Sequence, residues 1–187
     1  MMIGYALCGS FCTLGRSIDE MIRLKEAGHE LLPIMSETAY STDTRFGSAD
    51  EISDRIVYIC GRQIIHTIAD AEPLGPKIRL DLLIISPCTG NTLAKLANGI
   101  TDTAVTMAAK AHMRCDRPLL IALASNDAMS ANLANIGRML NRKNVYFVPL
   151  VQDDPIGKPH SLVADFSLLG EAADAAMEGK QLRPLFR

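Results

Sequence analysis

The chain has 187 residues, of which 48% are hydrophobic and 21% are charged, and its formal net charge is −2. A length of this order is typical of one domain with a substantial buried core. The near-neutral charge gives no indication of a nucleic-acid or acidic-membrane partner. The N-terminus lacks the pattern of a signal peptide, and no run reaches the roughly 18 apolar residues of a membrane span. We therefore expect a single cytoplasmic domain over residues 1–187.

The five cysteines form an odd set without a paired C-x-x-C motif. Cys8 and Cys12 alone are too few for a zinc site, which takes four ligands at recognisable spacing. We interpret all five as reduced thiols and expect no metal site. Cys12 and Cys88 lie in loops assigned below to a binding site, so they are the two that could take part in chemistry. A structural role is favoured for both.

The N-terminal part of the chain predicts a β–α–β unit. Residues 3–8 are a short apolar run typical of a buried strand, and the small polar loop 9–15 leads into a helix with apolar residues at helical spacing. Gly28 suits the end of that helix, and residues 30–35 predict the second strand. This start favours a three-layer α/β fold with a right-handed, doubly wound parallel sheet, either flavodoxin-like or Rossmann-like.

Two nucleotide-binding motifs nearly fit the first loop, and both fail. The dinucleotide fingerprint needs G-x-G-x-x-G, whereas only Gly9 and Gly15 are present. The P-loop needs a glycine where Ser10 stands and a Lys-Ser/Thr pair where Arg16 and Ser17 stand. The motifs therefore predict neither a nicotinamide dinucleotide nor ATP.

The central stretch, residues 81–111, has the features of an anion site. Residues 82–86 predict a buried parallel strand that Pro87 stops, and a helix pattern begins at Leu93. The small or polar residues between them are Cys88, Thr89, Gly90, Asn91 and Thr92. Backbone N–H groups and the helix dipole favour an anion at such a loop. Many similar loops hold no ligand, so both alternatives stay open on chemistry alone.

Residues 41–80 are the least regular stretch of the chain. The isoleucines around His66 predict a short helix that carries this histidine. A lone histidine is more often structural, so an acid–base role for His66 is one of two alternatives. After the central loop, Thr101 or Asp102 is expected to cap a helix over residues 103–112.

The C-terminal part predicts two more strands and two more helices. Residues 118–124 and 145–148 are expected to be buried strands, with an amphipathic helix between them over residues 129–140. The proline-punctuated stretch 151–164 predicts a loop, either a solvated surface or a lid or subunit contact. A closing helix is expected over residues 165–177.

The central loop resembles a segment of a known family, the homo-oligomeric flavin-containing cysteine decarboxylases. Residues 87–95 read P-C-T-G-N-T-L-A-K and residues 98–102 read N-G-I-T-D, which is similar to the family's PASANT segment. The Gly9-Ser10 loop and S-x-x-A at 36–39 fall where the family has its flavin loops.

The resemblance extends beyond that loop and covers about residues 3–150. N-x-x-M at 126–129 is similar to the family's PAMNxxM motif. The stretches E-P-L-G-P at 72–76, S-N-D at 125–127 and Q-D-D-P at 152–155 resemble one branch of the family. That branch belongs to spore-forming bacteria and supplies one component of an enzyme that makes dipicolinate.

The resemblance implies a flavodoxin-like fold, FMN bound between subunits, and a homo-oligomer that is a trimer or a dodecamer. Carried over residue by residue, it implies contacts to FMN or its phosphate from several loops. The residues so implied are Gly9, Ser10, Phe11, Ser36, Pro87, Cys88, Thr89, Gly90, Asn91, Thr92 and Ser125. His66 and Asn126 are the implied catalytic residues, with Asn126 facing the reacting substrate.

For the branch, the resemblance implies an oxidoreductase subunit that acts on a CH–CH or CH–NH group. It would oxidise dihydrodipicolinate, or its hydroxylated tetrahydro precursor, to dipicolinate in the mother-cell cytoplasm during sporulation. Aromatisation makes that step downhill, so the protein mainly needs to position a hydride acceptor and a base. The acceptor would be FMN, or a nicotinamide on a partner A subunit. Lys95 and Lys158 are candidate contacts for the dicarboxylate substrate, with a solvated lysine as the alternative for each.

Two other functions stay open. A flavin-dependent decarboxylase of a cysteine-containing substrate is disfavoured because L-A-S-N at 123–126 replaces P-A-M-N. His66 also lies 21 residues before Pro87, further than in the family. The third possibility is a non-catalytic scaffold that keeps the fold and stabilises the A subunit without a cofactor of its own.

Overall fold

One mixed sheet of seven strands forms the centre of the computed structural model, which describes all 187 residues. The parallel strands are β1 (Met2–Leu7), β2 (Glu30–Met35), β3 (Leu82–Thr89), β4 (Leu119–Ser125) and β5 (Val145–Phe147). Two short strands are antiparallel, β6 (Leu150–Val151) and β7 (Leu162–Ala164). The strand order is β2-β1-β3-β4-β7-β6, and β5 pairs with the first half of β4.

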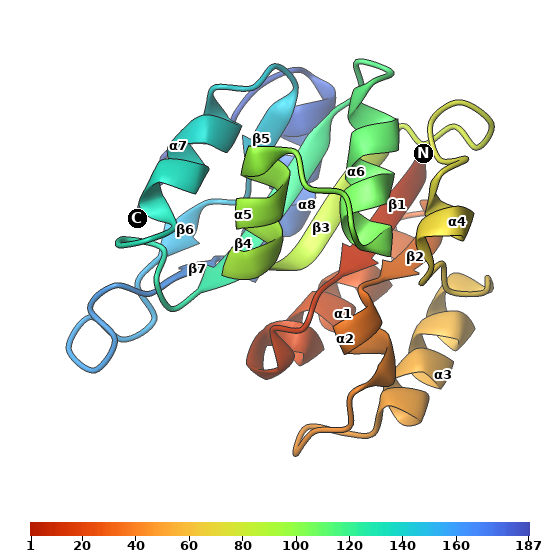
Figure 1. Ribbon diagram of the computed structural model, residues 1–187, viewed down its shortest axis with the longest axis horizontal. Helices are drawn as coiled ribbons and strands as arrows, with labels where there is room; N and C mark the ends of the chain where they lie inside the picture. Colours follow the sequence, from red (N-terminus) through yellow and green to blue (C-terminus); the bar gives the residue numbers. More distant parts are fainter.

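Helices cover both faces of this sheet and make three layers (Figure 1). One face carries α1 (Phe11–Glu26), α3 (Ala49–Cys60) and α8 (Leu169–Met177). The other carries α4 (Ile68–Ala71), α5 (Gly90–Asn98), α6 (Ala104–Met113) and α7 (Leu133–Leu140). The short helix α2 (Glu37–Ser41) follows β2, and a 3-10 turn (Phe166–Leu168) precedes α8. The expected three-layer α/β architecture is confirmed, with a sheet that is mostly rather than wholly parallel. None of the helices has the length and apolar character that a membrane crossing requires.

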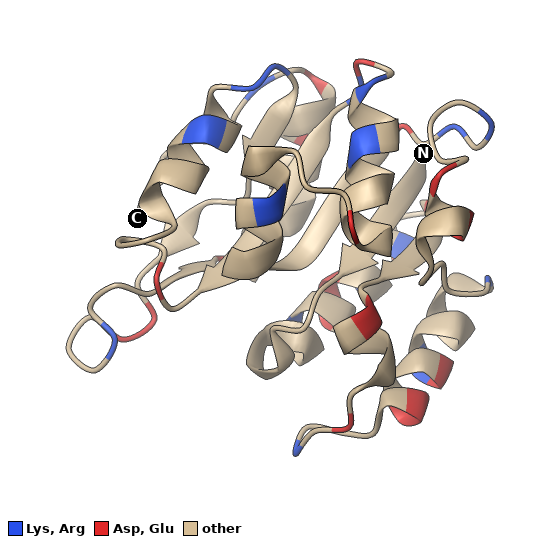
Figure 2. Cartoon of the chain, viewed as in Figure 1, with Lys and Arg blue, Asp and Glu red and all other residues tan.

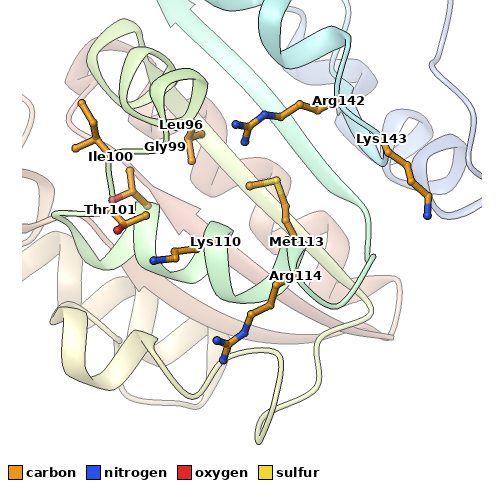
Figure 3. Close-up of a pocket in the computed structure, with 10 residues that line it drawn as sticks. Leu96, Gly99, Ile100, Thr101, Lys110, Met113, Arg114, Arg142 and Lys143 are labelled. Carbon is orange, nitrogen blue, oxygen red and sulfur yellow. The ribbon is translucent and has the colours of Figure 1, made fainter.

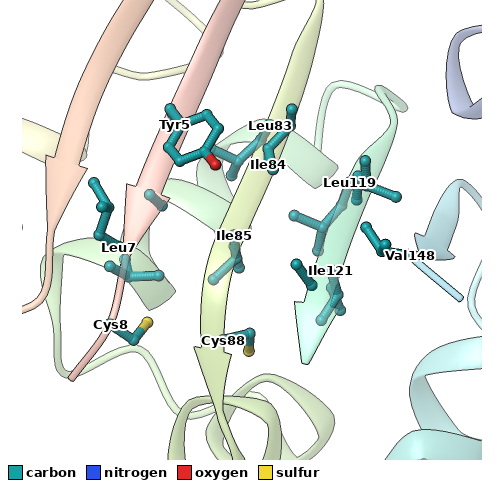
Figure 4. Close-up of a cluster of buried hydrophobic side chains, with 14 of the residues drawn as sticks. Tyr5, Leu7, Cys8, Leu83, Ile84, Ile85, Cys88, Leu119, Ile121 and Val148 are labelled. Carbon is teal, nitrogen blue, oxygen red and sulfur yellow. The ribbon is translucent and has the colours of Figure 1, made fainter. Parts of the chain in front are cut away.

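The central strands are buried on both faces, which explains why they appear in the sequence as continuous apolar runs. Side chains such as Leu83, Ile85 and Ile121 are fully buried and pack between neighbouring strands and the helices above and below (Figure 4). One continuous cluster of buried hydrophobic residues draws on every strand of the sheet. The carboxyl ends of the strands are therefore held by a shared core.

Strand β3 does not end at Pro87, so the expectation that the proline stops it is wrong. The register of β3 against β4 shifts between Ile85 and Cys88, and the two residues beyond the shift pair with β4 again. This irregularity accommodates a proline, which has no N–H to donate to the ladder. As a result β3 reaches Thr89, and this threonine becomes the N-cap of α5.

Residues 41–80 contain a regular helix, α3, that the sequence analysis did not predict. Ser48 accepts a hydrogen bond from the backbone N–H of Glu51, whose carboxylate accepts one from the backbone N–H of Ser48. This reciprocal capping box begins the helix. Gly61 ends it in the left-handed conformation, with a φ of 66°.

The short helix expected around His66 is wrong. The backbone of Ile65 forms an isolated parallel bridge with Ile34, so this segment runs extended beside β2. The helix α4 begins only at Ile68. His66 is thus held near the carboxyl end of β2, and its ring stacks on Tyr40 with centroids 3.8 Å apart and planes 5° apart.

The expected cap of α6 is also corrected, because Thr103 rather than Thr101 or Asp102 is its N-cap. The hydroxyl of Thr103 accepts a hydrogen bond from the backbone N–H of Thr106, and the Thr106 hydroxyl accepts one from the backbone N–H of Thr103. The helix therefore begins one residue later than a cap at Asp102 requires.

Residues 151–164 form more than the expected loop, because β6 and β7 lie at its two ends. β7 pairs with the carboxyl half of β4, at Ala124 and Ser125. The residues between the two strands, 152–161, project from the body of the molecule (Figure 1). The backbone N–H of Met129 donates to the carbonyl of His160 at 2.9 Å. The projecting segment is therefore tied to the turn that follows β4.

Candidate functional site

Two adjoining grooves lie at the carboxyl edge of the sheet, where loops from β1, β3 and β4 meet. The first, groove A, has a volume of about 630 Å³ and lies between residues 9–12, the start of α5 and residues 124–132. The second, groove B, has a volume of about 440 Å³ and lies between the same first two loops, residues 36–38 and residues 102–103. Ligands of open α/β sheets bind at this edge.

Three helix N-termini converge on groove B. Ser36, Thr89 and Thr103 are the N-caps of α2, α5 and α6, and each hydroxyl accepts a hydrogen bond from a backbone N–H three residues further on. The first turns of α5 and α6 contain no acidic side chain. Uncapped N–H groups and aligned peptide dipoles give this end of each helix a positive potential. Groove B is therefore suited to an anion such as a phosphate.

Lys95 supplies the one cationic side chain that lines groove B. Its Nζ lies 2.9 Å from the carboxylate of Asp102. This hydrogen bond and charge hold the pKa of Asp102 below its usual value. Lys95 thus enters any contact with an anion already engaged, and the candidate role of this lysine depends on sharing it with Asp102.

Buried hydroxyl and thiol groups join the loops after β1 and β3. The Thr92 hydroxyl accepts a hydrogen bond from Thr89 Oγ1 at 3.1 Å and donates to the Sγ of Cys8 at 3.3 Å. Burial raises the pKa of Cys8 to about 11 and the pKa of Cys88 well above its usual value. Both are neutral thiols at pH 7, and neither has the thiolate character that cysteine chemistry requires.

Asp127 and Asn132 are site residues that the sequence analysis missed. Asp127 is the one charged side chain that lines groove A. Its carboxylate accepts hydrogen bonds from Ser125 Oγ and from Asn132 Nδ2, the latter at 2.9 and 3.0 Å. These bonds lower the pKa of Asp127, so the group is ionised at neutral pH. Groove A therefore repels anions and favours a ligand face with N–H groups. A short polar residue directly after Asn126 at a strand's carboxyl end was the available signal.

Gly90 allows the start of α5 to pack against this turn. A Cβ at Gly90 would lie 2.5 Å from Ser125 Oγ and 2.7 Å from Asn132 Nδ2. No larger side chain fits without displacing those atoms. The glycine of the central loop is thus required for a close approach, and it joins the loops after β3 and β4 into one wall of groove A.

The structure brings most of the predicted cofactor residues to the two grooves. Those that line them are Gly9, Ser10, Phe11, Ser36, Thr89, Gly90, Asn91, Thr92 and Ser125. Pro87 and Cys88 are buried within β3 and line neither groove. Of the predicted catalytic residues, Asn126 lines groove A and is exposed.

His66 and Lys158 lie outside both grooves. His66 stacks on Tyr40, beyond the carboxyl end of β2. Lys158 lies on the projecting segment 152–161, and its Nζ is 3.2 Å from an oxygen of Asp153. A single copy of the chain therefore does not place either residue at the site.

With this fold and site in view, residues 2–165 match the family model described as Flavoprotein, and the chain belongs to that family. It is 42% identical over 183 residues to the B subunit of dipicolinate synthase from Bacillus subtilis (strain 168), a match that covers 98% of this chain and 92% of that protein. The crystal structure of the same synthase's B subunit from Bacillus halodurans C matches with a TM-score of 0.91 at 40% identity, over 100% of this chain and 95% of that one. The resemblance to this branch of the family is thus confirmed.

A more distant solved structure shows the same fold. The dodecameric FMN-dependent Ubix-like decarboxylase from Escherichia coli O157:H7 matches with a TM-score of 0.65 at 24% identity. The match covers 80% of each chain. Relatives within the fold therefore include enzymes.

Proposed function

We propose that this chain is an FMN-binding component of a two-part enzyme, which oxidises dihydrodipicolinate, or its hydroxylated tetrahydro precursor, to dipicolinate together with an A subunit. The observation that carries the proposal is the pairing of an anion-binding groove with a second groove at one sheet edge. The Bacillus subtilis relative is named as the second of two kinds of chain in its synthase, which supports a partner subunit. The FMN dependence of the Escherichia coli relative supports the cofactor.

The residues of the two grooves fit the two ends of FMN. Groove B, with the hydroxyls of Ser36 and Thr89 and three helix N-termini, suits the phosphate. Groove A contains the Asp127 carboxylate and no cation, so it suits a neutral ring system with an N–H group. A bound flavin would supply a two-electron acceptor. A nicotinamide on the A subunit is the alternative acceptor.

The chain's own groups would orient the substrate and handle its proton. Oxidation of the ring removes a hydride equivalent and a proton, so a base and an aligned acceptor are needed. Asn126 exposes its amide at groove A and would hold a substrate carboxylate, and Lys95 would add a positive charge from groove B. Lys158 would reach the substrate only if the segment 152–161 closes over groove A.

His66 requires a second copy of the chain for a catalytic role. It lines neither groove of its own subunit, so a neighbouring copy would have to present it to the cofactor. This fits FMN bound between subunits of a trimer or dodecamer, and the Escherichia coli relative is dodecameric. We propose the same kind of homo-oligomer here, in the mother-cell cytoplasm of a sporulating bacterium.

The test is a titration of the purified protein with FMN, followed by visible absorption and flavin fluorescence. The substitution Asn91→Ala removes a side chain that lines both grooves and makes no hydrogen bond within the fold. We expect it to weaken FMN binding by about threefold to tenfold, the cost of one neutral hydrogen bond. The control Asn141→Ala changes an exposed asparagine after α7 and should leave binding unchanged.

The redox part of the proposal is tested anaerobically. Addition of dihydrodipicolinate and the A subunit should bleach the bound flavin and release dipicolinate. A colourless protein that ignores FMN would exclude the flavoenzyme. Full activity of the A subunit alone would favour the scaffold, and release of carbon dioxide from a cysteine-ending peptide would favour the decarboxylase.

A further inference from the structure

A third hollow lies on the outer side of the layer formed by α5, α6 and α7, away from both grooves (Figure 3). It has a volume of about 390 Å³ and shares no lining residue with groove A or groove B. Leu96, Ile100 and Met113 give it an apolar surface. Its charged lining residues are all basic: Lys110, Arg114, Arg142 and Lys143. We call this hollow the cationic pocket.

Two of these cations have no counter-ion in the fold. Lys143 lies 3.1 Å from Asp116, and Arg114 lies 4.0 Å from Glu72. Lys110 and Arg142 form no ion pair. Their head groups lie on opposite sides of Met113 (Figure 3). The pocket therefore presents two free positive charges across an apolar surface.

The helix dipoles explain part of this arrangement. Lys110 lies in the last turn of α6, and Arg142 follows the end of α7 by two residues, so each is close to a helix C-terminus that favours a cation. That effect acts on each cation separately and is screened by solvent. It does not explain why cations from two helices face one hollow without an acidic partner, on a face rich in Lys and Arg (Figure 2).

We propose that the cationic pocket binds a small organic dianion, with one carboxylate on Lys110, the other on Arg142, and the apolar body on Met113 and Leu96. A guanidinium binds a planar carboxylate through two parallel hydrogen bonds, and an ammonium binds the second as a compact charge. Inorganic phosphate carries the charge but leaves the apolar surface uncovered. The ligand class rests on these residues alone; only its identity with the product dipicolinate rests on the proposed function.

The experiment is isothermal titration calorimetry with isophthalate, an aromatic dicarboxylate that has no ring nitrogen to chelate metals. Benzoate and inorganic phosphate serve as comparison ligands. We expect one isophthalate site per chain, with benzoate and phosphate at least about tenfold weaker, because each lacks either one charge or the apolar body. Binding should persist when the protein is saturated with FMN.

The variant K110A/R142A should weaken isophthalate binding by at least about tenfold. The control K25A/K77A removes two exposed cations elsewhere and thus makes the same change in net charge. It should leave binding unchanged. Circular dichroism checks that both variants are folded.

Four results would overturn the proposal. They are absence of isophthalate binding, equal binding by K110A/R142A, loss of binding on saturation with FMN, and phosphate binding as tightly as isophthalate. If isophthalate does not bind and K110A/R142A changes the oligomeric state, the pocket is instead covered by a second copy of the chain. A failed FMN titration leaves the proposal standing, because the two readouts are separate.

Discussion

Replacing Gly90 by alanine tests how the start of α5 packs on the turn after β4. A Cβ at this position would lie 2.5 Å from Ser125 Oγ, 2.7 Å from Asn132 Nδ2 and 3.0 Å from Asp127 Oδ1. The first two atoms donate hydrogen bonds to the ionised carboxylate of Asp127. They cannot withdraw without lengthening those bonds, so the methyl group strains a network that holds three segments together.

The expected loss combines overpacking with a weakened charged hydrogen bond. Overpacking costs about 1–3 kcal/mol, and a hydrogen bond to a charged group contributes about 1.5–3 kcal/mol. The helix preference of alanine offsets at most about 1 kcal/mol of this. We expect Gly90→Ala to lower the free energy of unfolding by about 2 kcal/mol. For a chain of this size that corresponds to a fall in Tm of roughly 4–8 °C.

Urea unfolding followed by circular dichroism measures the effect. Gly137→Ala is the matched control, because this helical glycine has nothing within 4 Å of the added Cβ. It should stabilise the protein by about 0.5–1 kcal/mol. If Gly90→Ala is as stable as the wild type, the close approach does not exist. Asn132→Ala should also cost less in the Gly90→Ala background than alone, and equal costs would refute the coupling.

Three further predictions concern Asp127, the thiols and α3. Asp127→Asn should lower stability at pH 7 by about 1 kcal/mol, because solvent-screened hydrogen bonds to the carboxylate are weakened. Since the folded pKa lies below the usual 3.8, this difference is present above about pH 4 and is lost as the pH falls through the folded pKa. Equal differences at pH 7 and pH 3 would contradict it. Iodoacetamide at neutral pH should label the exposed Cys12 and Cys115, and the buried thiols only after unfolding, as judged by intact mass. Ser48→Ala should remove the capping box of α3 and cost about 1 kcal/mol in urea unfolding, and an unchanged midpoint would count against that cap.

The strands and the position of the site could be predicted because both follow from local patterns. Strands buried on both faces must be apolar throughout, so β1, β2, β3 and β4 are visible as short runs of such residues. Parallel strands also place their carboxyl ends at one edge, which brings the polar loops after β1, β3 and β4 together. The loop residues Ser10, Asn91 and Ser125 could be assigned to that edge without knowledge of any distance.

The errors arise where tertiary pairing decides the local structure. Pro87 would end an isolated strand, but the shifted register against β4 carries β3 past it. The strands β6 and β7 have two and three residues, too few for any periodicity, and exist only through their pairing. The helix α3 is different, since Ser48, Glu51 and Gly61 are readable signals of its two ends.

Within the site, the contacts that depend on side-chain distance were not predictable. Asn132 reaches back to both oxygens of Asp127, and Lys95 reaches forward to Asp102. The sequence shows these residues to be polar and nearby in the chain, but not that they touch. The same limit applies to His66, whose place beside β2 is set by the backbone bridge of its neighbour.

The pairing of β7 with β4 has a consequence for the growing chain. Ribosomal synthesis completes β4 well before it reaches β7, so the carboxyl half of β4 waits with free N–H and C=O groups along one side. Such an open edge is a template for pairing with another chain. The antiparallel strand at Leu162–Ala164 covers it beside Ala124 and Ser125. Release of a chain truncated before this strand should therefore yield aggregates that form at the very edge where a ligand would otherwise bind.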